Sequence, residues 1–304
     1  MILVWGLPGD SPIAEVHAAL EAIGQPAFFL DQRRAPETRV QLRVQPAVSG
    51  WLEIDNQVLD LTAVRAAYVR PYDSRRLRAV ASAGPESPEW QAALGVEDVL
   101  LSFCELTPAL VVNRPSAMAA NGSKPYQSRL IASFGFCVPE TLVTTDPEAA
   151  AEFWRRHEQV VYKSISGVRS VVARLTPEHE ERLRNISWCP TQFQQWIAGE
   201  DVRVHVVGDE VFSCQVKSTA DDYRYASGTT AVAIEPLELP IEVAERCIAA
   251  ARAMQLPVAG LDLRYSSAGD WYCFEVNPSP GFSYFQRQTG QQIDVAIAAL
   301  LASR

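Results

Sequence analysis

The sequence of 304 residues lacks the segments that would mark a membrane or secreted protein. No apolar run approaches the roughly 20 residues that a transmembrane helix needs. Met1–Trp5 carries no basic n-region, and Asp10 follows too soon for a signal peptide. The net charge of −9 leaves too few cations to grip a polyanion over a broad surface. We therefore expect a cytoplasmic protein with neither a membrane nor a nucleic acid as its partner.

Clusters of cysteine and histidine are also missing. The six cysteines form no C-x-x-C pair and mostly have apolar neighbours, which is typical of small core residues, and the four histidines are scattered. A zinc site or a Cys–His nucleophile is therefore not expected. Gly6–Gly9 follows an apolar strand as a phosphate loop would, but it lacks the Gly-Lys-Ser/Thr ending, and no G-x-G-x-x-G occurs.

Short apolar runs alternate with helical patterns over the first 112 residues, which favours an open, mostly parallel α/β sheet. Strands are predicted at 2–5, 27–30, 51–54, 58–61, 66–70 and 110–112, and helices at about 11–23 and 89–105. A lobe of mixed helices and strands follows, in which Thr145 and Glu148 have the spacing of a capping box. The last lobe is rich in strands. The expected domains are 1–112, 113–190 and 191–304.

The most informative pattern is a predicted hairpin in the last lobe. A four-residue loop at 267–270 places Asp262 opposite Glu275 and Asn277 opposite Gly260. A slip of one residue would mix polar and apolar faces, so the pattern defines the pairing. The apolar face of this hairpin consists of Leu261, Leu263, Phe274 and Val276.

The polar face of this hairpin has the composition of a metal site. Two carboxylates directly opposite each other repel, so a further charge is expected to offset them. Asp262, Glu275 and Asn277 offer hard oxygen ligands, which suit Mg²⁺ held in part by substrate phosphates. An exposed polar face with Arg264 nearby is the alternative.

A second hairpin is predicted over Asp201–Lys217. A three-residue loop at Gly208–Glu210 separates the valines from a polar face that carries Arg203 and Lys217. Two cations on one face could clamp a phosphate or an acyl phosphate, so both are candidate catalytic residues. A solvated outer face is the alternative. His205, on the same face, is interpreted as structural.

Two weaker signals are basic. Lys163 ends an apolar strand before a Ser/Gly loop, where it could reach phosphate oxygens or be an ordinary surface lysine. A group of arginines follows a strand of the first lobe and is either solvated or a patch that docks substrate. These arginines are Arg70, Arg75, Arg76 and Arg78.

In combination these residues resemble the ATP-grasp superfamily, and within it the RimK-like carboxylate–amine ligases. Gly260–Leu263 followed by Phe274–Gly281 is similar to that family's metal-binding end. Phe193–Ile197 followed by Asp201–Gly208 is similar to its adenine hinge and the next strand. Tyr162–Gly167 also resembles the graspetide synthetases, which build ester or amide links within precursor peptides. The resemblance covers the second and third lobes.

The resemblance implies an ATP-grasp fold, with an N-terminal open α/β pre-ATP-grasp domain before two α+β lobes that hold ATP and Mg²⁺. The implied nucleotide-binding residues are Lys124, Lys163, Gln195, Trp196, Ile197 and Asp201. The implied metal ligands are Asp262, Glu275 and Asn277. Arg203 and Arg224 match arginines of the family that stabilise the phosphate groups and the reaction intermediate. The sequence departs from the family at Gln195, where an acid is common, and in the single glycine after Lys163.

The implied activity is an ATP-dependent ligase that converts a carboxylate to an acyl phosphate and joins it to an amine or a hydroxyl. A peptide or protein substrate is favoured, and a small amino-acid substrate is the alternative. A nucleotide-binding regulator on a decayed ligase scaffold is an alternative of another class, against which the intact metal ligands and lysines count. The donor, the acceptor and the oligomeric state, including a homo-oligomer, stay open.

Overall fold

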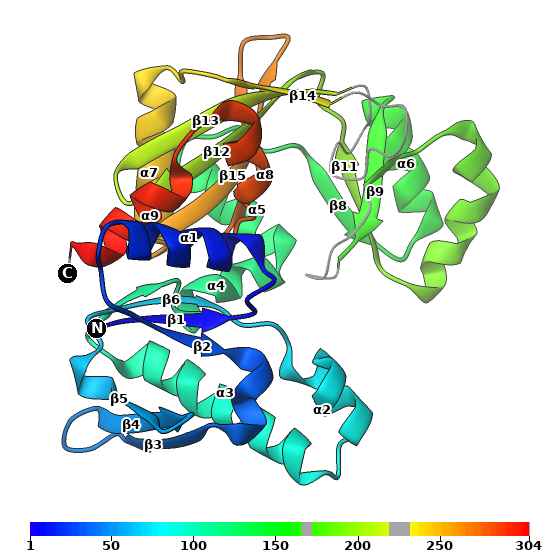
Figure 1. Ribbon diagram of the computed structural model, residues 1–304. Helices are drawn as coiled ribbons and strands as arrows, with labels where there is room; N and C mark the ends of the chain where they lie inside the picture. The colour runs from blue at the N-terminus through cyan, green and yellow to red at the C-terminus, as the bar shows by residue number, and fades with distance from the viewer. Residues whose placement is uncertain (166–171, 219–231, 304) are drawn as a thin grey trace.

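The computed structural model describes residues 1–165, 172–218 and 232–303, and Figure 1 shows its three lobes. The N-terminal lobe contains a parallel sheet in the order β2-β1-β6-β7. α1 (Ser11–Ala22) covers one face and α3 (Pro88–Leu106) the other, so both faces are buried, as expected for such a sheet. The strands are β1 (Ile2–Gly6), β2 (Ala27–Asp31), β6 (Ala66–Arg70) and β7 (Leu110–Val112).

A small antiparallel sheet extends this lobe, with β3 (Arg39–Arg43), β4 (Ser49–Ile54) and β5 (Gln57–Asp60) in that order. Asp55 and Asn56 form a two-residue turn between β4 and β5, with φ of 51° and 59°, as a twisted hairpin favours. β3 was not predicted, although Arg39–Arg43 alternates arginine and glutamine strictly with aliphatic residues, as a half-buried strand does. Short helices complete the lobe, namely η1 (Gln32–Glu37), η2 (Leu61–Ala63), η3 (Ser74–Arg76) and α2 (Arg78–Ala83).

The central lobe is an antiparallel sheet in the order β10-β9-β11-β8, with helices on one face. Its elements are β8 (Thr141–Thr144), α6 (Pro147–His157), β9 (Val160–Ser164), β10 (Ala173–Arg174), η5 (Pro177–Trp188) and β11 (Thr191–Gln195). Because β11 pairs with both β8 and β9, this sheet extends past the boundary expected at 190/191. The helix cap also differs: Asp146, rather than Thr145, accepts the backbone N–H of Glu148.

The third lobe contains the sheet β14-β13-β12-β15-β16, with antiparallel neighbours throughout. α7 covers one face, and α8 and α9 lie on the other, where α9 also contacts α1 (Figure 1). The strands are β12 (Gly199–Val207), β13 (Glu210–Ser218), β14 (Val232–Pro236), β15 (Val258–Ser266) and β16 (Trp271–Asn277). The helices are α7 (Ile241–Ala253), α8 (Ser283–Thr289) and α9 (Ile293–Ala302).

Two helical segments join the first lobe to the rest. α4 (Pro115–Met118) and the short η4 (Ala119–Gly122) lead into α5 (Lys124–Ser133), which packs along β16. Ile131 of α5 enters the core between this sheet and α7. The residues from 113 onward therefore contact the third lobe before the chain enters the central one.

The turn between β12 and β13 is shorter than predicted. Val207 pairs with Glu210, so Gly208 and Asp209 alone form the turn, with Gly208 at φ 59°. Arg203 consequently shares a face with Cys214, and the predicted common face for Arg203 and Lys217 is wrong. The prediction failed because it assumed that one face of the hairpin is polar, whereas apolar side chains and helices cover both faces of this sheet.

Cys104, Cys214, Cys247 and Cys273 are buried, which confirms their assignment as core residues, while Cys137 and Cys189 are exposed. Burial raises the pKa of the Cys104 thiol to about 12, which leaves it protonated and unreactive. Among the helices of the described residues, none has the length and apolar content to cross a membrane.

Candidate active site

Two carboxylates and an amide meet on one face of β15 and β16. Asp262 lies opposite Glu275 and Asn277 opposite Gly260, which confirms the predicted pairing there. A β-bulge follows, because Leu263 pairs with Cys273 instead of Phe274.

The bulge corrects the predicted apolar face. Cys273, at 1% exposure, joins Leu261, Leu263 and Val276 in the core. Phe274 is only partly buried, and the Arg264 guanidinium lies 5.1 Å from its ring centre. The bulge therefore leaves both Phe274 and Glu275 outside the core.

Each carboxylate of this face has a cation beside it. Arg203 on β12 faces Asp262, with Nη1 2.5 Å from Oδ1, and Lys124 of α5 places Nζ 3.6 Å from Glu275 Oε1. The Arg203 side chain is only 6% exposed, so the pair is largely shielded from water. These two cations offset the repulsion between the carboxylates.

Gly260 makes room for Arg203. A β-carbon built on Gly260 would lie 2.1 Å from Arg203 Nη2 and 2.6 Å from Cβ of Pro280. No side chain can occupy that space, so glycine is required at this point by close approach rather than by its backbone angles.

The loop after β16 is tied to the N-terminal lobe by residues that were not singled out for this role. Arg70, at the end of β6, donates from Nε to Asp10 at 2.7 Å and from Nη1 to Ser279 Oγ at 2.8 Å and Pro280 O at 3.1 Å. Asn113, which follows β7, donates through Nδ2 to the carbonyls of Val258 and Pro278. Polar residues directly after parallel strands are the signal that could have indicated them.

His205 lies beneath the same loop. Its ring is buried beside Phe285, and burial first, then the Arg203 charge, hold its pKa well below the ordinary histidine value. A hydrogen bond with the Gly281 backbone opposes these effects only in part. His205 is therefore neutral, in agreement with its interpretation as a structural residue.

The predicted nucleotide-binding residues lie mainly along the junction of the central and third lobes. Lys163 on β9 pairs with Gln192 on β11, so the two side chains share a face of the central sheet. Gln192 is 1% exposed, and its Oε1 has no hydrogen-bond partner within the described part of the chain. A buried orphan acceptor next to a lysine suits a ligand that brings its own donors.

The predicted hinge follows β11. Trp196 donates its backbone N–H to Gln159 O at 3.0 Å, and the Arg174 guanidinium lies 4.2 Å from its ring centre. Arg264 donates to Ile197 O at 2.7 Å and pairs with Asp201 at the same distance. Arg264 therefore links the hinge to the acid expected to contact ribose. Gln195, the last residue of β11, donates its N–H to Glu140 O.

Two predicted catalytic residues, Lys217 and Arg224, are not among the described residues beside Arg203 and the carboxylates. Lys217 forms an ion pair of 2.6 Å with Glu235 on the exposed side of β13 and β14, on the face opposite to Arg203. Arg224 lies outside the described residues.

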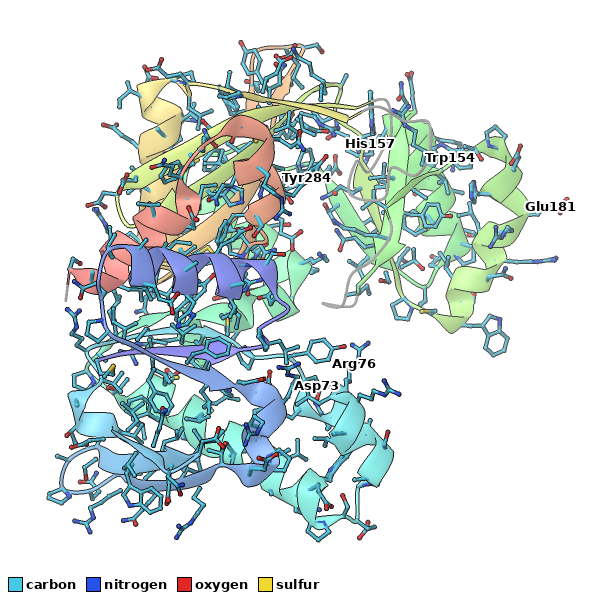
Figure 2. All side chains as sticks on the ribbon, viewed as in Figure 1. Asp73, Arg76, Trp154, His157, Glu181 and Tyr284 are labelled. Atoms are coloured by element: carbon cyan, nitrogen blue, oxygen red, sulfur yellow. The ribbon has the colours of Figure 1, made fainter. Side chains whose placement is uncertain are left out.

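The predicted arginine patch does not form one surface. Arg70 is 15% exposed and turned inward, whereas Arg75 is 63% exposed and pairs with Asp73. Arg76 lies 5.5 Å from the ring centre of Tyr72. Figure 2 shows Arg76 and Asp73 at the edge of the N-terminal lobe, on the side of the molecule that carries the central lobe.

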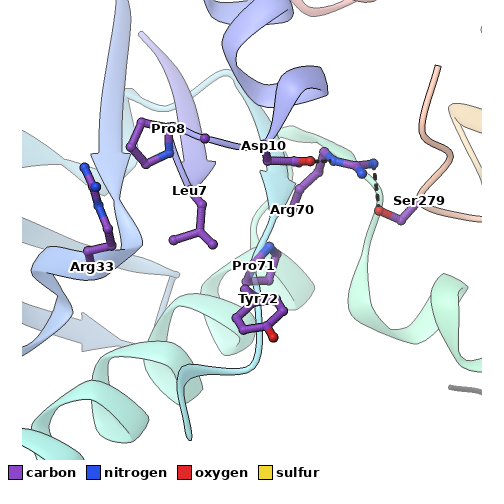
Figure 3. Close-up of a pocket in the computed structure, with 9 residues that line it drawn as sticks. Leu7, Pro8, Asp10, Arg33, Arg70, Pro71, Tyr72 and Ser279 are labelled. Carbon is purple, nitrogen blue, oxygen red and sulfur yellow. Dashed lines mark hydrogen bonds and ion pairs between the residues drawn. The ribbon is translucent and has the colours of Figure 1, made fainter. Parts of the chain in front are cut away.

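Arg70 instead borders a cavity of about 560 Å³. The loops after β1 and β6 flank it, at the point where the strand order of the parallel sheet reverses, which is where open α/β sheets bind ligands. Figure 3 shows Arg70 between Asp10 and Ser279, with Leu7, Pro8, Pro71 and Tyr72 around the hollow. Ser279 brings the loop that follows the carboxylates to the edge of this cavity.

The donor set fits a magnesium–nucleotide site. Two carboxylates and one amide oxygen are hard ligands, and they leave other positions for phosphate oxygens and water. In the described ranges there is no cluster of three His, Cys, Asp or Glu that would form a metal cage without such help. A strand pair that bears hard ligands, with Lys124 beside one of them, has the composition of a nucleotide-dependent phosphoryl-transfer site.

Solved structures with this architecture include ATP-grasp ligases. The structure of the ligase PsnB with a minimal precursor, Mg and ADP has a TM-score of 0.82 and 28% identity, over 99% of this chain and 96% of that one. The macrocyclase MdnC of Microcystis aeruginosa, solved with its precursor peptide MdnA, has a TM-score of 0.84 over the full length of both chains, and at 20% identity it supports the fold alone.

The RimK-like ATP-grasp domain model matches residues 123–301, and the chain belongs to this family. The ribosomal protein bS6–L-glutamate ligase of Escherichia coli is 28% identical over 207 residues, which are 63% of this chain and 66% of that protein. A protein of Marinobacter nauticus named "Probable alpha-L-glutamate ligase" is 28% identical over 209 residues, 64% of this chain and 67% of the relative. The expected ATP-grasp fold and the ligase class are thus confirmed.

Replacement of Gly260 by alanine should displace Arg203. The new methyl group overlaps the guanidinium, so we expect about 1–3 kcal/mol lower stability to urea and loss of ATP turnover. Gly95→Ala is the matched control, because a β-carbon there meets nothing within 4 Å and helix α3 favours alanine. A Gly260→Ala protein with wild-type ADP release would show that Arg203 need not hold its place.

Acid should destabilise the protein through His205. The unfolded histidine takes up a proton near pH 6.5, whereas the folded one, with its lowered pKa, does not. Stability from this group is complete above pH 6.5 and falls below it, by about 1.4 kcal/mol per pH unit. Between pH 7.5 and 5.5, the free energy of unfolding measured in urea should fall less steeply with decreasing pH for His205→Gln than for the wild type or His17→Gln. Equal slopes in all three proteins would contradict this account.

Proposed function

We propose that this protein is an ATP- and Mg²⁺-dependent ligase that activates a carboxylate as an acyl phosphate and transfers it to an amine or a hydroxyl. The observation that carries the proposal is the pairing of Asp262 with Glu275 across β15 and β16, with Arg203 and Lys124 beside them. Hard ligands next to two cations suit the transfer of a phosphoryl group from a nucleotide.

Each residue of the proposed site has a distinct role. Asp262, Glu275 and Asn277 would hold Mg²⁺, which neutralises charge on the phosphates when it is bound. Lys124 and Lys163 would bind phosphate oxygens, and the Trp196–Ile197 segment would receive the adenine. The sequence expectation for Asp201 is contact with the ribose.

Arg203 would stabilise the charge that develops on the transferred phosphoryl group and on the acyl phosphate. Its guanidinium is held by Asp262 at 2.5 Å and has little freedom, so little reorganisation is needed when charge develops. The substrate carboxylate would attack the γ-phosphorus with ADP as the leaving group. The amine or hydroxyl acceptor, which loses a proton, would then attack the acyl carbon and displace inorganic phosphate. Positioning and electrostatics supply the rate without a protein nucleophile.

A peptide is the substrate that we favour. The PsnB and MdnC structures are named as complexes with precursors, and the bS6 ligase is named for a protein substrate. The cavity beside Arg70 could receive a peptide segment, because its lining combines the apolar Leu7 and Pro71 with the guanidinium of Arg33. A small amino acid is the alternative substrate, and cytoplasmic ATP would serve either reaction.

Glu275→Ala should abolish Mg²⁺-dependent ADP release and keep the fold. The carboxylate is proposed as a metal ligand, and its removal leaves Asp262 and Asn277 too weak a pair to hold the ion at the phosphates. Glu235→Ala, which removes an exposed carboxylate two strands beyond β12, is the control and should retain turnover. Circular dichroism checks folding. Near-wild-type ADP release by Glu275→Ala would place the metal elsewhere. If the wild-type protein released no ADP with any substrate, a decayed regulator would be favoured.

Gly9→Phe should fill the cavity without disturbing the chain. A β-carbon on Gly9 meets nothing within 4 Å, and its φ lies outside the left-handed region. We expect KM for short Glu- and Asp-containing peptides to rise on the order of tenfold, with ATP affinity unchanged, because the binding lost is remote from the phosphates. Gly9→Ala is the small-residue control. An unchanged KM removes the cavity from the proposal, and ADP release driven fully by free glutamate would favour the small substrate.

A further inference from the structure

Gln127, a residue with no assigned role, holds the edge of the metal-binding strand. β16 is the last strand of its sheet, and in the described part of the chain no further strand pairs with its outer edge, which the backbone of Cys137 bridges near Tyr272. The Gln127 side chain donates from Nε2 to Val276 O at 2.8 Å, and its Oε1 accepts from Val276 N at 3.1 Å. The amide thus binds one residue of β16 as a neighbouring strand would. It is 3% exposed, so no water competes for these bonds.

Val276 is the point where β16 most needs such support. It lies between Glu275 and Asn277, the two proposed metal ligands of this strand. The β-bulge interrupts the ladder on the side of Glu275, and Pro278, which has no N–H to donate, follows Asn277. With the ladder weakened on both sides, the Gln127 amide restrains the peptide groups from which both ligands project.

Gln127 also couples this strand to a second part of the site. Lys124 lies three residues earlier on α5, on the same side of the helix, with Nζ 3.6 Å from Glu275 Oε1. Ile131, one turn beyond Gln127, anchors the helix in the core. The Gln127 amide therefore sets the distance between a proposed phosphate-binding lysine and a proposed metal ligand.

We propose that Gln127 is a positioning residue for the magnesium–nucleotide complex, which it aligns by clamping the Val276 peptide between Glu275 and Asn277. This inference rests on the metal site of the proposed function. Residues that orient metal ligands without touching the ion typically contribute about 10- to 100-fold in metal affinity. A purely structural glutamine would contribute to stability alone.

The chain offers a matched control. Gln32 is 1% exposed and clamps the Tyr72 backbone in the same two-way manner, accepting from Tyr72 N at 2.8 Å and donating to Tyr72 O at 2.5 Å. It lies in the N-terminal lobe, away from β16. Methionine at either position keeps the length of the side chain and removes the pair of backbone hydrogen bonds. At Gln32 it also removes a hydrogen bond of 3.1 Å from Nε2 to Ser74 Oγ, so Gln32→Met should lose at least as much stability as Gln127→Met.

The experiment measures Mn²⁺ binding to the full chain in the presence of saturating ADP, by electron paramagnetic resonance, together with thermal unfolding. Gln127→Met should weaken Mn²⁺ binding by about tenfold or more, whereas Gln32→Met should leave it unchanged. Gln127→Glu keeps the acceptor for Val276 N and loses the donor, so an intermediate affinity is expected and covers the case in which the methionine variant fails to fold.

Mn²⁺ affinity at the wild-type level in Gln127→Met, together with a loss of thermal stability, would overturn the inference and make the glutamine structural. The proposed metal site fails separately, if Glu275→Ala also binds Mn²⁺ with wild-type affinity. The two failures are distinguishable because the Glu275 variant tests the ligand and the Gln127 variant tests only its alignment.

Discussion

A guanidinium that is almost fully buried needs a negative charge beside it within the protein, and Asp262 on the neighbouring strand provides that charge for Arg203. This pair organises the strands around it. Gly260 lacks a side chain because the guanidinium occupies its space, and His205 stays neutral partly because the same charge lies beside it. The loop over Gly260 begins at Asn277, so the position of Arg203 and the geometry of the metal-binding strand depend on each other.

The lobes are joined through this region by side chains rather than by a shared sheet. Arg70 and Asn113 reach from the ends of parallel strands to the loop after β16, and α5 lies along the edge of that strand. The N-terminal lobe therefore contacts the loop that directly follows the proposed metal ligands. This gives the first 112 residues a structural role for which the sequence offered no motif.

The success and failure of the hairpin predictions have one physical cause. Alternation along β15 and β16 separates carboxylates from aliphatic residues, so the facing of Asp262 and Glu275 follows from local geometry. Along β12 and β13 the same rule was applied to a sheet covered on both sides, where valine and phenylalanine occur on either face. The turn was misjudged because apolar residues carry no information about register when both faces are buried.

By itself, the sequence determined the parallel first lobe, the paired carboxylates and the family, because these depend on period-two patterns and on motifs within short segments. Tertiary structure decided that Lys217 lies away from Arg203, that Arg70 turns inward and that Gln127 clamps Val276. Those outcomes depend on partners up to about 200 residues away. A polar side chain becomes structural or functional according to the element that covers it, which no local pattern contains.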